Sequence, residues 1–264
     1  MSEGKKEILL GDCLELMKDI PNGSIDMILC DLPYGTTACK WDVIIPFDKL
    51  WEQYERIIKP NGAIVLTASQ PFTSVLIMSN MGKYKYNWTW NKKAPYGFAF
   101  AKHQPLRVIE DIVVFNVKNN YNPQMTLAEA KNKRPRNKKY IVDGDLTANI
   151  KNRYAGDDHN EDLRYPINYI EIRNDTAECN KLNRIHPTQK PIELMEYLIK
   201  TYTNENDLIL DNCAGSGTTA IACLNTKRQF IVMEKEQKYY DIILKRVGDF
   251  NKNFETQTLF GNEM

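Results

Sequence analysis

The sequence of 264 residues predicts a doubly wound α/β fold, and two observations carry that prediction. Short apolar runs typical of buried strands alternate with stretches whose apolar residues recur at helical spacing. Conspicuous motifs follow two of these runs, one starting at Asp31 and one at Asp211. Open α/β sheets bind their ligands beyond the carboxyl ends of the strands, so we expect a site where these two motifs meet.

The part of the chain before residue 118 alternates strand and helix patterns. We expect strands at 8–10, 25–30, 63–67, 84–93 and 108–117, and helices at 13–17, 47–58 and 71–81. Asp12 is a candidate N-cap of the first helix. The segment 59–62, Lys-Pro-Asn-Gly, is expected to end the second helix. Residues 94–105 combine Pro, Gly and aromatic residues without periodicity, and we expect a mobile loop there.

Residues 118–184 differ in composition from the rest, since Asn, Lys, Arg and Asp dominate and apolar runs are short. This segment is expected to be an inserted module outside the sheet. Within it, six of the nine residues from 131 to 139 are basic. They are Lys131, Lys133, Arg134, Arg136, Lys138 and Lys139. The cluster is either a solvated loop or a loop that contacts nucleic-acid phosphates.

Strand and helix patterns resume in the last part of the chain. We expect helices at 191–199, 215–224 and 236–250, and strands at 207–210 and 229–233. Pro191 lies in the first turn of its helix, where proline is tolerated. The tail from residue 251 gives little signal.

Composition limits the class of protein. Net charge is +1, and 42% of residues are hydrophobic, which is ample for a core. The sequence contains no run of 18 apolar residues and no apolar leader, so we expect a cytoplasmic protein without a membrane span. The six cysteines are scattered with no C-x-x-C pair, so neither a zinc site nor a disulfide framework is expected.

The first motif, Asp31-Leu32-Pro33-Tyr34, suits the binding of a nucleobase amino group. A carboxylate and loop carbonyls accept hydrogen bonds from an NH2 group, and an aromatic ring stacks on a flat base. The alternative is a plain turn, because Asp, Pro and Gly are common turn residues.

The second motif, residues 211–219, joins a strand to a helix through small residues. Gly215 and Gly217 let a ligand approach the backbone, and the helix start offers N–H groups to an anion. Glu234 ends the next strand, where an acid binds ribose hydroxyls. The pattern indicates an adenosine-containing cofactor, although it lacks the third glycine of a dinucleotide fold and the lysine of a P-loop. A plain tight turn is the alternative.

Together the motifs resemble the β class of DNA amino-methyltransferases, which use S-adenosylmethionine. Residues 31–34 resemble its D-P-P-Y, 211–219 its D-P-F-x-G-S-G-T-T, 186–191 its H-P-T-Q-K-P, and 11–14 its G-D-x-L. The resemblance implies a Rossmann-like methyltransferase domain formed by 1–117 and 185–264, with 118–184 as an inserted target-recognition module. Leu32 and the pair Asn212-Cys213 depart from the pattern, but they remove no group that the reaction needs.

The resemblance also implies roles for individual residues. Asp31, Leu32, Pro33 and Tyr34 would hold the flipped base, with the Asp31 carboxylate and the Leu32 carbonyl accepting its amino group. Glu234 would bind the ribose hydroxyls, Asp12 and the Cys13 backbone the adenine, and Lys190 the cofactor's carboxylate. The methionine part would be surrounded by Asp211, Asn212, Cys213, Ala214, Gly215, Ser216, Gly217, Thr218 and Thr219.

Asp31 favours adenine-N6 over cytosine-N4, because the family's cytosine enzymes usually have Ser at that position. The expected partner is double-stranded DNA, and a homodimer and a cognate restriction endonuclease are left open. The alternatives to an adenine enzyme are a cytosine-N4 methyltransferase, an RNA amino-methyltransferase, a catalytically silent nucleic-acid-binding relative and a small-molecule methyltransferase.

Overall fold

The structure is a computed structural model. It describes residues 5–37, 39, 42–118, 120–127, 162–174 and 189–260, with side chains up to 252. The chain forms two compact units, one made of 1–122 and 168–264 and the other of 123–167. The described part of the smaller unit contains one antiparallel pair, β6 (Thr126–Leu127) and β7 (Leu163–Arg164).

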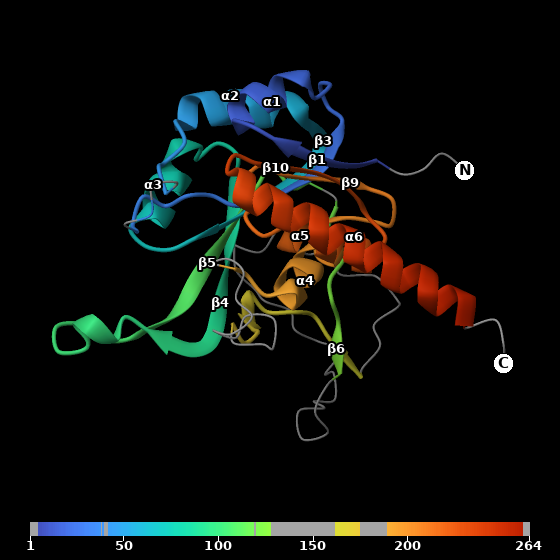
Figure 1. Ribbon diagram of the computed structural model, residues 1–264. Coiled ribbons are helices and arrows are strands. Elements are labelled where there is room, and N and C mark those ends of the chain that lie inside the picture. The colour runs from blue at the N-terminus through green and yellow to red at the C-terminus, as the bar shows by residue number, and fades with distance from the viewer. Residues whose placement is uncertain are drawn as a thin grey trace, which may run out of the picture. The chain divides into compact units, whose positions relative to one another are not determined.

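The larger unit is built on an eight-stranded sheet (Figure 1). Its strands in spatial order are β1 (Lys6–Leu10), β10 (Gln229–Glu234), β9 (Leu208–Asp211), β2 (Ile25–Asp31), β3 (Ile58–Ala68), β5 (Arg107–Phe115), β4 (Tyr84–Tyr96) and β8 (Tyr169–Glu171). The first five run parallel, β5 is antiparallel to β3 and to β4, and β8 is parallel to β4. The predicted doubly wound α/β fold is therefore confirmed.

Helices cover both faces of this sheet (Figure 1). They are α1 (Cys13–Leu16), α2 (Phe47–Ile57), α3 (Phe72–Ser79), α4 (Ile192–Tyr202), α5 (Thr218–Asn225) and α6 (Gln237–Phe260), with short 3₁₀ turns at Met17–Asp19 and Phe98–Phe100. Successive residues of β2 point to opposite faces, so Met27 packs with the core under α4–α6 and Ile28 with the core under α1–α3. A strand buried on both faces reads as a continuous apolar run, which is why the sequence revealed it.

The segment 59–62 corrects one prediction, because it continues β3 and does not end a helix as a turn. A Cβ on Gly62 would lie 2.7 Å from the backbone oxygen of Asp26, so glycine allows β2 and β3 to approach closely. Lys59 also pairs with the Asp26 carboxylate at 2.7 Å. The glycine that suggested a turn is needed here for strand contact.

Three other boundaries differ from the prediction. β4 runs to Tyr96, which pairs with Arg107, so the connection between β4 and β5 is shorter than the predicted loop 94–105. α6 continues past residue 250 to Phe260. The compact second unit is narrower than the predicted insertion 118–184, because β8 adds to the main sheet beside β4. The assignment of that insertion to target recognition stays a prediction.

Candidate active site

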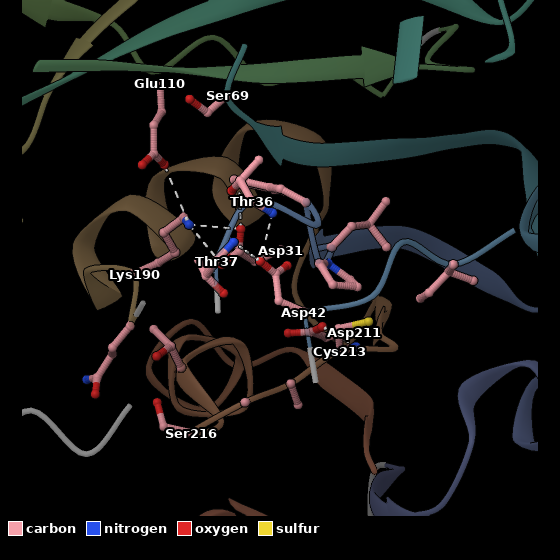
Figure 2. Close-up of a pocket in the computed structure, with 18 of the residues that line it drawn as sticks. Asp31, Thr36, Thr37, Asp42, Ser69, Glu110, Lys190, Asp211, Cys213 and Ser216 are labelled. Atoms are coloured by element: carbon pink, nitrogen blue, oxygen red, sulfur yellow. Dashed lines mark hydrogen bonds and ion pairs between the residues drawn. The ribbon is translucent and has the colours of Figure 1, made fainter. Parts of the chain in front are cut away.

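The two sequence motifs meet because their strands are neighbours. β2 pairs in parallel with β9, with Ile28 opposite Leu210, so Asp31 and Asp211 end adjacent strands at the same edge. A cavity of about 1050 Å³ opens there (Figure 2). Its lining includes every predicted catalytic and cofactor residue except Gly217: Asp12, Cys13, Asp31, Leu32, Pro33, Tyr34, Lys190, Asp211, Asn212, Cys213, Ala214, Gly215, Ser216, Thr218, Thr219 and Glu234.

The Asp31 carboxylate is surrounded by donors. Its Oδ1 accepts the hydroxyl of Tyr34 at 2.8 Å and the hydroxyl of Thr67. Thr67 lies opposite Asp31 in the β2–β3 register, so the pairing of the strands brings it there. The Nζ of Lys190 lies 2.8 Å from both oxygens of Asp31. These contacts orient the carboxylate toward the cavity (Figure 2).

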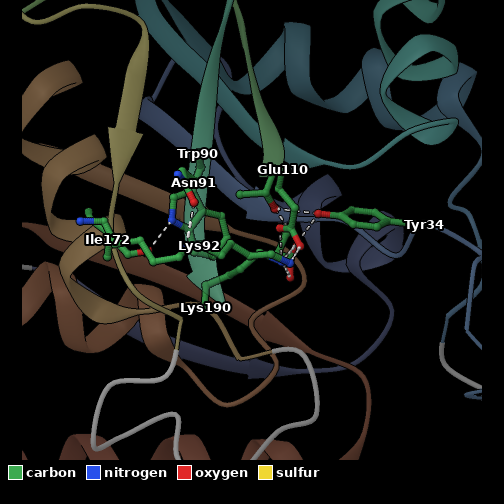
Figure 3. A network of polar contacts seen from close by, with 10 residues as sticks. Tyr34, Trp90, Asn91, Lys92, Glu110, Ile172 and Lys190 are labelled. Atoms are coloured by element: carbon green, nitrogen blue, oxygen red, sulfur yellow. Dashed lines mark hydrogen bonds and ion pairs between the residues drawn. The ribbon is translucent and has the colours of Figure 1, made fainter. Parts of the chain in front are cut away.

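Lys190 contacts two carboxylates of the protein in this structure. Besides Asp31 it faces Glu110, whose Oε2 lies 3.5 Å from its Nζ (Figure 3). Burial opposes the charge of Lys190, but the fields of Asp31 and Glu110 outweigh it and raise its pKa, so the ammonium stays charged. Its predicted contact with the cofactor's carboxylate stays a prediction.

The Tyr34 side chain is held at its hydroxyl and on one face of its ring. Its hydroxyl bonds Asp31, and its ring stacks on Phe72 with centroids 5.0 Å apart. Burial raises the pKa of Tyr34 well above its usual value, so the phenol stays a hydrogen-bond donor. Tyr34 therefore forms a rigid part of the cavity wall.

The loop after Tyr34 is held by a residue that the sequence analysis missed. The buried Asp42 accepts the backbone N–H groups of Gly35 at 2.9 Å, Thr36 at 2.9 Å and Thr37 at 2.7 Å. Burial works against its charge, but the hydrogen bonds from Thr37 and the loop backbone outweigh it and lower the pKa of Asp42. Asp42 thus keeps the loop closed around a charged carboxylate.

The glycine-rich turn after β9 is tied to Glu234 at the end of β10. The Gly215 N–H donates to Oε2 of Glu234 at 2.8 Å, and the Glu236 N–H donates to Oε1 at 2.8 Å. Gly215 and Gly217 have φ of +55° and +79°, which favour glycine. Burial raises the pKa of Glu234. The turn is therefore preformed, and Glu234 helps to shape it whatever else it binds.

Asp211 and Asn212 brace the start of the same turn. Asp211 accepts the Cys213 N–H at 3.1 Å and the Thr219 hydroxyl at 2.6 Å, and burial raises its pKa to about 6. The Tyr54 hydroxyl of α2 donates to Oδ1 of Asn212. Asn212, one of the two departures from the family motif, therefore has a specific partner in this chain.

Asp12 confirms the predicted N-cap, since its carboxylate accepts the Leu14 N–H at 3.0 Å. Its other oxygen lies 3.1 Å from the Nζ of Lys235. A hydrogen bond with the Cys213 thiol lowers the pKa of Cys13, so two cysteines meet on the cavity wall.

The basic cluster 131–139 and residues 186–188 of the H-P-T-Q-K-P motif lie outside the described residues. None of the helices in the described ranges is long and apolar enough to cross a membrane. Among those same residues, no three or more His, Cys, Asp or Glu side chains are grouped so as to hold a metal ion.

Comparison with known proteins assigns this geometry to a family. A family model described as DNA methylase, of the N6/N4 methyltransferase type, matches residues 25–245. The type II methyltransferase M.HpaI of Haemophilus parainfluenzae is 25% identical over 260 residues, which covers 93% of this chain and 76% of the relative. The DNA adenine methyltransferase YhdJ of Escherichia coli (strain K12) is 26% identical over 266 residues, covering 92% and 82%.

Solved structures agree with the observed fold. The crystal structure of the M1.HpyAVI–SAM complex is 25% identical with a TM-score of 0.58, covering 91% of this chain and 98% of that one. The cytosine-N4-specific PvuII DNA methyltransferase is 16% identical with a TM-score of 0.63, covering 91% and 85%. This second likeness shows the shared fold alone.

Proposed function

This chain belongs to the N6/N4 DNA methylase family and is a DNA methyltransferase that uses S-adenosylmethionine, and we propose that its target is the exocyclic N6 of adenine. One observation carries the proposal: the Asp31 carboxylate faces the cavity from the edge of the sheet that also carries the glycine-rich turn. Among the relatives, YhdJ is named an adenine methyltransferase. The identity of residue 31 as Asp also favours adenine.

The residues present fit the cofactor. Two glycines with positive φ let a ligand approach the turn before α5, and the first turn of that helix has N–H groups without intrahelical partners. The buried Glu234 carboxylate lines the same cavity and supplies acceptors for ribose hydroxyls. Bound there, S-adenosylmethionine supplies an electrophilic methyl group on a positively charged sulfur.

The protein's part in the reaction is to position and polarise the amino group. That nitrogen is a weak nucleophile, because its lone pair is delocalised into the ring of the base. Hydrogen bonds from its two N–H groups to the Asp31 carboxylate and the Leu32 carbonyl favour a more tetrahedral, more nucleophilic nitrogen. Pro33 and the fixed ring of Tyr34 stack beside the base and offset the cost of unstacking it from the duplex.

The hairpin between β4 and β5 supports duplex DNA as the substrate. Phe98 and Phe100 are 67% and 55% exposed, and Phe98 also lines the cavity. Apolar side chains at such a place can fill the gap that a flipped base leaves in the stack. The basic residues of the predicted insertion would contact phosphates, which stays a prediction, as do a homodimer and a restriction partner.

Cytosine-N4 methylation is the second candidate, because cytosine also offers an NH2 group and the PvuII enzyme shares the fold. The test is mass spectrometry of nucleosides from DNA treated with the protein and S-adenosylmethionine. N6-methyladenine is the expected product, and N4-methylcytosine would replace the adenine assignment. If neither methylated nucleoside formed on varied unmodified DNA, both the adenine and the cytosine assignment would be refuted.

Substitution of Asp31 tests its role. Asp31→Ala is expected to lower methyl transfer by at least roughly a hundredfold, because the amino group loses its charged acceptor. Cofactor affinity, measured by calorimetry, should change little, since no cofactor residue is removed. Retention of activity by a folded Asp31→Ala protein would contradict the mechanism.

A further inference from the structure

We propose that Glu110 is a positioning residue for methyl transfer: its Oε2, which accepts no hydrogen bond from the described residues, receives the ammonium of Lys190 when the amino group of the target base occupies Asp31. This inference rests on the proposed reaction at Asp31, and it applies equally to an adenine or a cytosine amino group. It concerns a buried network on β4, β5 and the residues before α4 (Figure 3).

Asp31 is already occupied in the free protein. Four hydrogen bonds reach its carboxylate, three at Oδ1 and one at Oδ2, and two of the four come from Lys190. A carboxylate has about four good acceptor directions, so Lys190 takes the same acceptors that an arriving amino group needs. The amino group binds Asp31 well only if Lys190 moves away.

Glu110 offers the place to which Lys190 can move. Its Oε1 is 2.6 Å from Lys92 Nζ, whereas its Oε2 is buried and has no hydrogen-bond partner among the described residues. The Nζ of Lys190 lies 3.5 Å from that Oε2, within ion-pair range but beyond a good hydrogen bond. A shift of less than about 1 Å would complete the bond, and a buried acceptor left without a donor is costly.

The rest of the network holds Glu110 still. The buried Lys92 bonds its Oε1 and lies 3.6 Å from the ring centroid of Tyr96. Glu110 pairs with Trp90 across the β4–β5 register, two residues before Lys92. The four charged groups, two lysines and two carboxylates, sum to zero. Moving Lys190 from one carboxylate toward the other therefore keeps the net charge of the network at zero, because the entering amino group is neutral, and Asp31 exchanges the ammonium for neutral N–H donors.

The neighbouring Asp111 provides a matched control. It lies next to Glu110 on β5 but on the other face of the strand, where its Oδ2 accepts the Thr73 hydroxyl at 2.8 Å. Asp111→Asn removes a charge from the same strand without touching the network. It is expected to leave the rate of methyl transfer within about twofold of the wild type.

The experiment is a double-substitution cycle in the full chain, with Glu110→Gln and Lys190→Met. The single-turnover rate of transfer of a labelled methyl group to DNA is measured at saturating cofactor, alongside the cofactor Kd. Glu110→Gln is expected to slow transfer at least about tenfold with the cofactor Kd within about twofold. In the Lys190→Met background the same change should cost less than about twofold, because the group that Glu110 receives is gone.

The proposal would be overturned if Glu110→Gln slowed methyl transfer equally in the wild-type and Lys190→Met proteins. It would also be overturned if Glu110→Gln raised the cofactor Kd enough to account for the slower transfer. If Lys190→Met does not fold, Glu110→Asp decides: retention of charge should restore part of the rate lost in Glu110→Gln, and an Asp variant slower than Gln would overturn the role. Failure of the wild type to methylate any DNA would instead refute the proposed function itself.

Discussion

The charge of Asp211 should destabilise the folded protein at neutral pH, and Asp211→Asn should relieve that cost. Burial raises the pKa of this carboxyl from 3.8 to about 6. The folded state therefore binds the proton of Asp211 more tightly than the unfolded state does. The stability that this bound proton contributes is lost as pH rises from about 4 to 6. Above pH 6 the ionised Asp211 lowers the free energy of unfolding by about 3 kcal/mol relative to the protonated form.

The substitution keeps the local geometry. Asn at 211 can accept the Cys213 N–H through Oδ1 and donate to the Thr219 hydroxyl through its amide, in place of the two bonds that Asp211 accepts. The amide does not titrate. The advantage of Asp211→Asn over the wild type should therefore grow by about 1.4 kcal/mol between pH 5.0 and 7.5, given unfolded and folded pKa values of 3.8 and about 6.

Urea unfolding at the two pH values measures this difference, from the midpoint and slope of each curve. Asp241→Asn, which removes an exposed carboxylate from α6, controls for the change in net charge. A stability difference that stays constant between pH 5.0 and 7.5, or that shrinks as pH rises, would refute the account of Asp211 as a buried, costly charge.

Three further predictions concern the walls of the cavity and the turn before α5. Asp42→Ala should slow methyl transfer at least about tenfold, with a smaller effect on cofactor Kd, since three backbone N–H groups of the loop after Tyr34 lose their acceptor; equal effects on both would contradict it. Gly217→Ala should lower the free energy of unfolding, measured in urea, by about 1–2 kcal/mol, because φ is +79° and the new Cβ would lie 3.0 Å from Ile243. The control is Gly248→Ala in α6, where the new Cβ meets no atom within 4 Å and the free energy of unfolding should rise slightly. Alkylation of Cys13 by iodoacetamide, followed by peptide mass spectrometry, should be slowed by S-adenosylmethionine, because Cys13 lines the cavity; an unchanged rate would place the cofactor elsewhere.

The main features of the site could be predicted from sequence because they depend on local order along the chain. β2 and β9 are buried on both faces, so their apolar runs stand out, and the motifs come directly after them. Parallel strands bring their carboxyl ends to one edge whatever their separation in sequence. The meeting of Asp31 with the glycine-rich turn therefore required that the two strands be parallel neighbours in one sheet.

The partners of these motif residues could not be predicted, because they depend on register and on which face a side chain takes. Thr67 reaches Asp31 only through the β2–β3 pairing. Glu110 and Asp111 are adjacent polar residues in the strand expected at 108–117, but the direction in which each side chain points follows from the β4–β5 register and the position of α3. A shift of one residue would have exchanged their roles.

The departures from the family motif have different structural consequences in the two halves of the site. Leu32 is 4% exposed and packs in the core under α1–α3, so its side chain adds buried apolar area. The loop lacks the rigidity that a proline would give at this position, but the backbone carbonyl is the same. Asn212 instead brings a hydrogen bond from Tyr54 that a proline could not accept through its side chain. That bond links α2, which packs in the same core cluster as Leu32, to the glycine-rich turn before α5. Each half of the site is thus held by contacts with residues outside its own motif. Lys190 and Glu110 are such residues beside Asp31, so substitutions there should change the rate of methyl transfer more than the affinity for the cofactor.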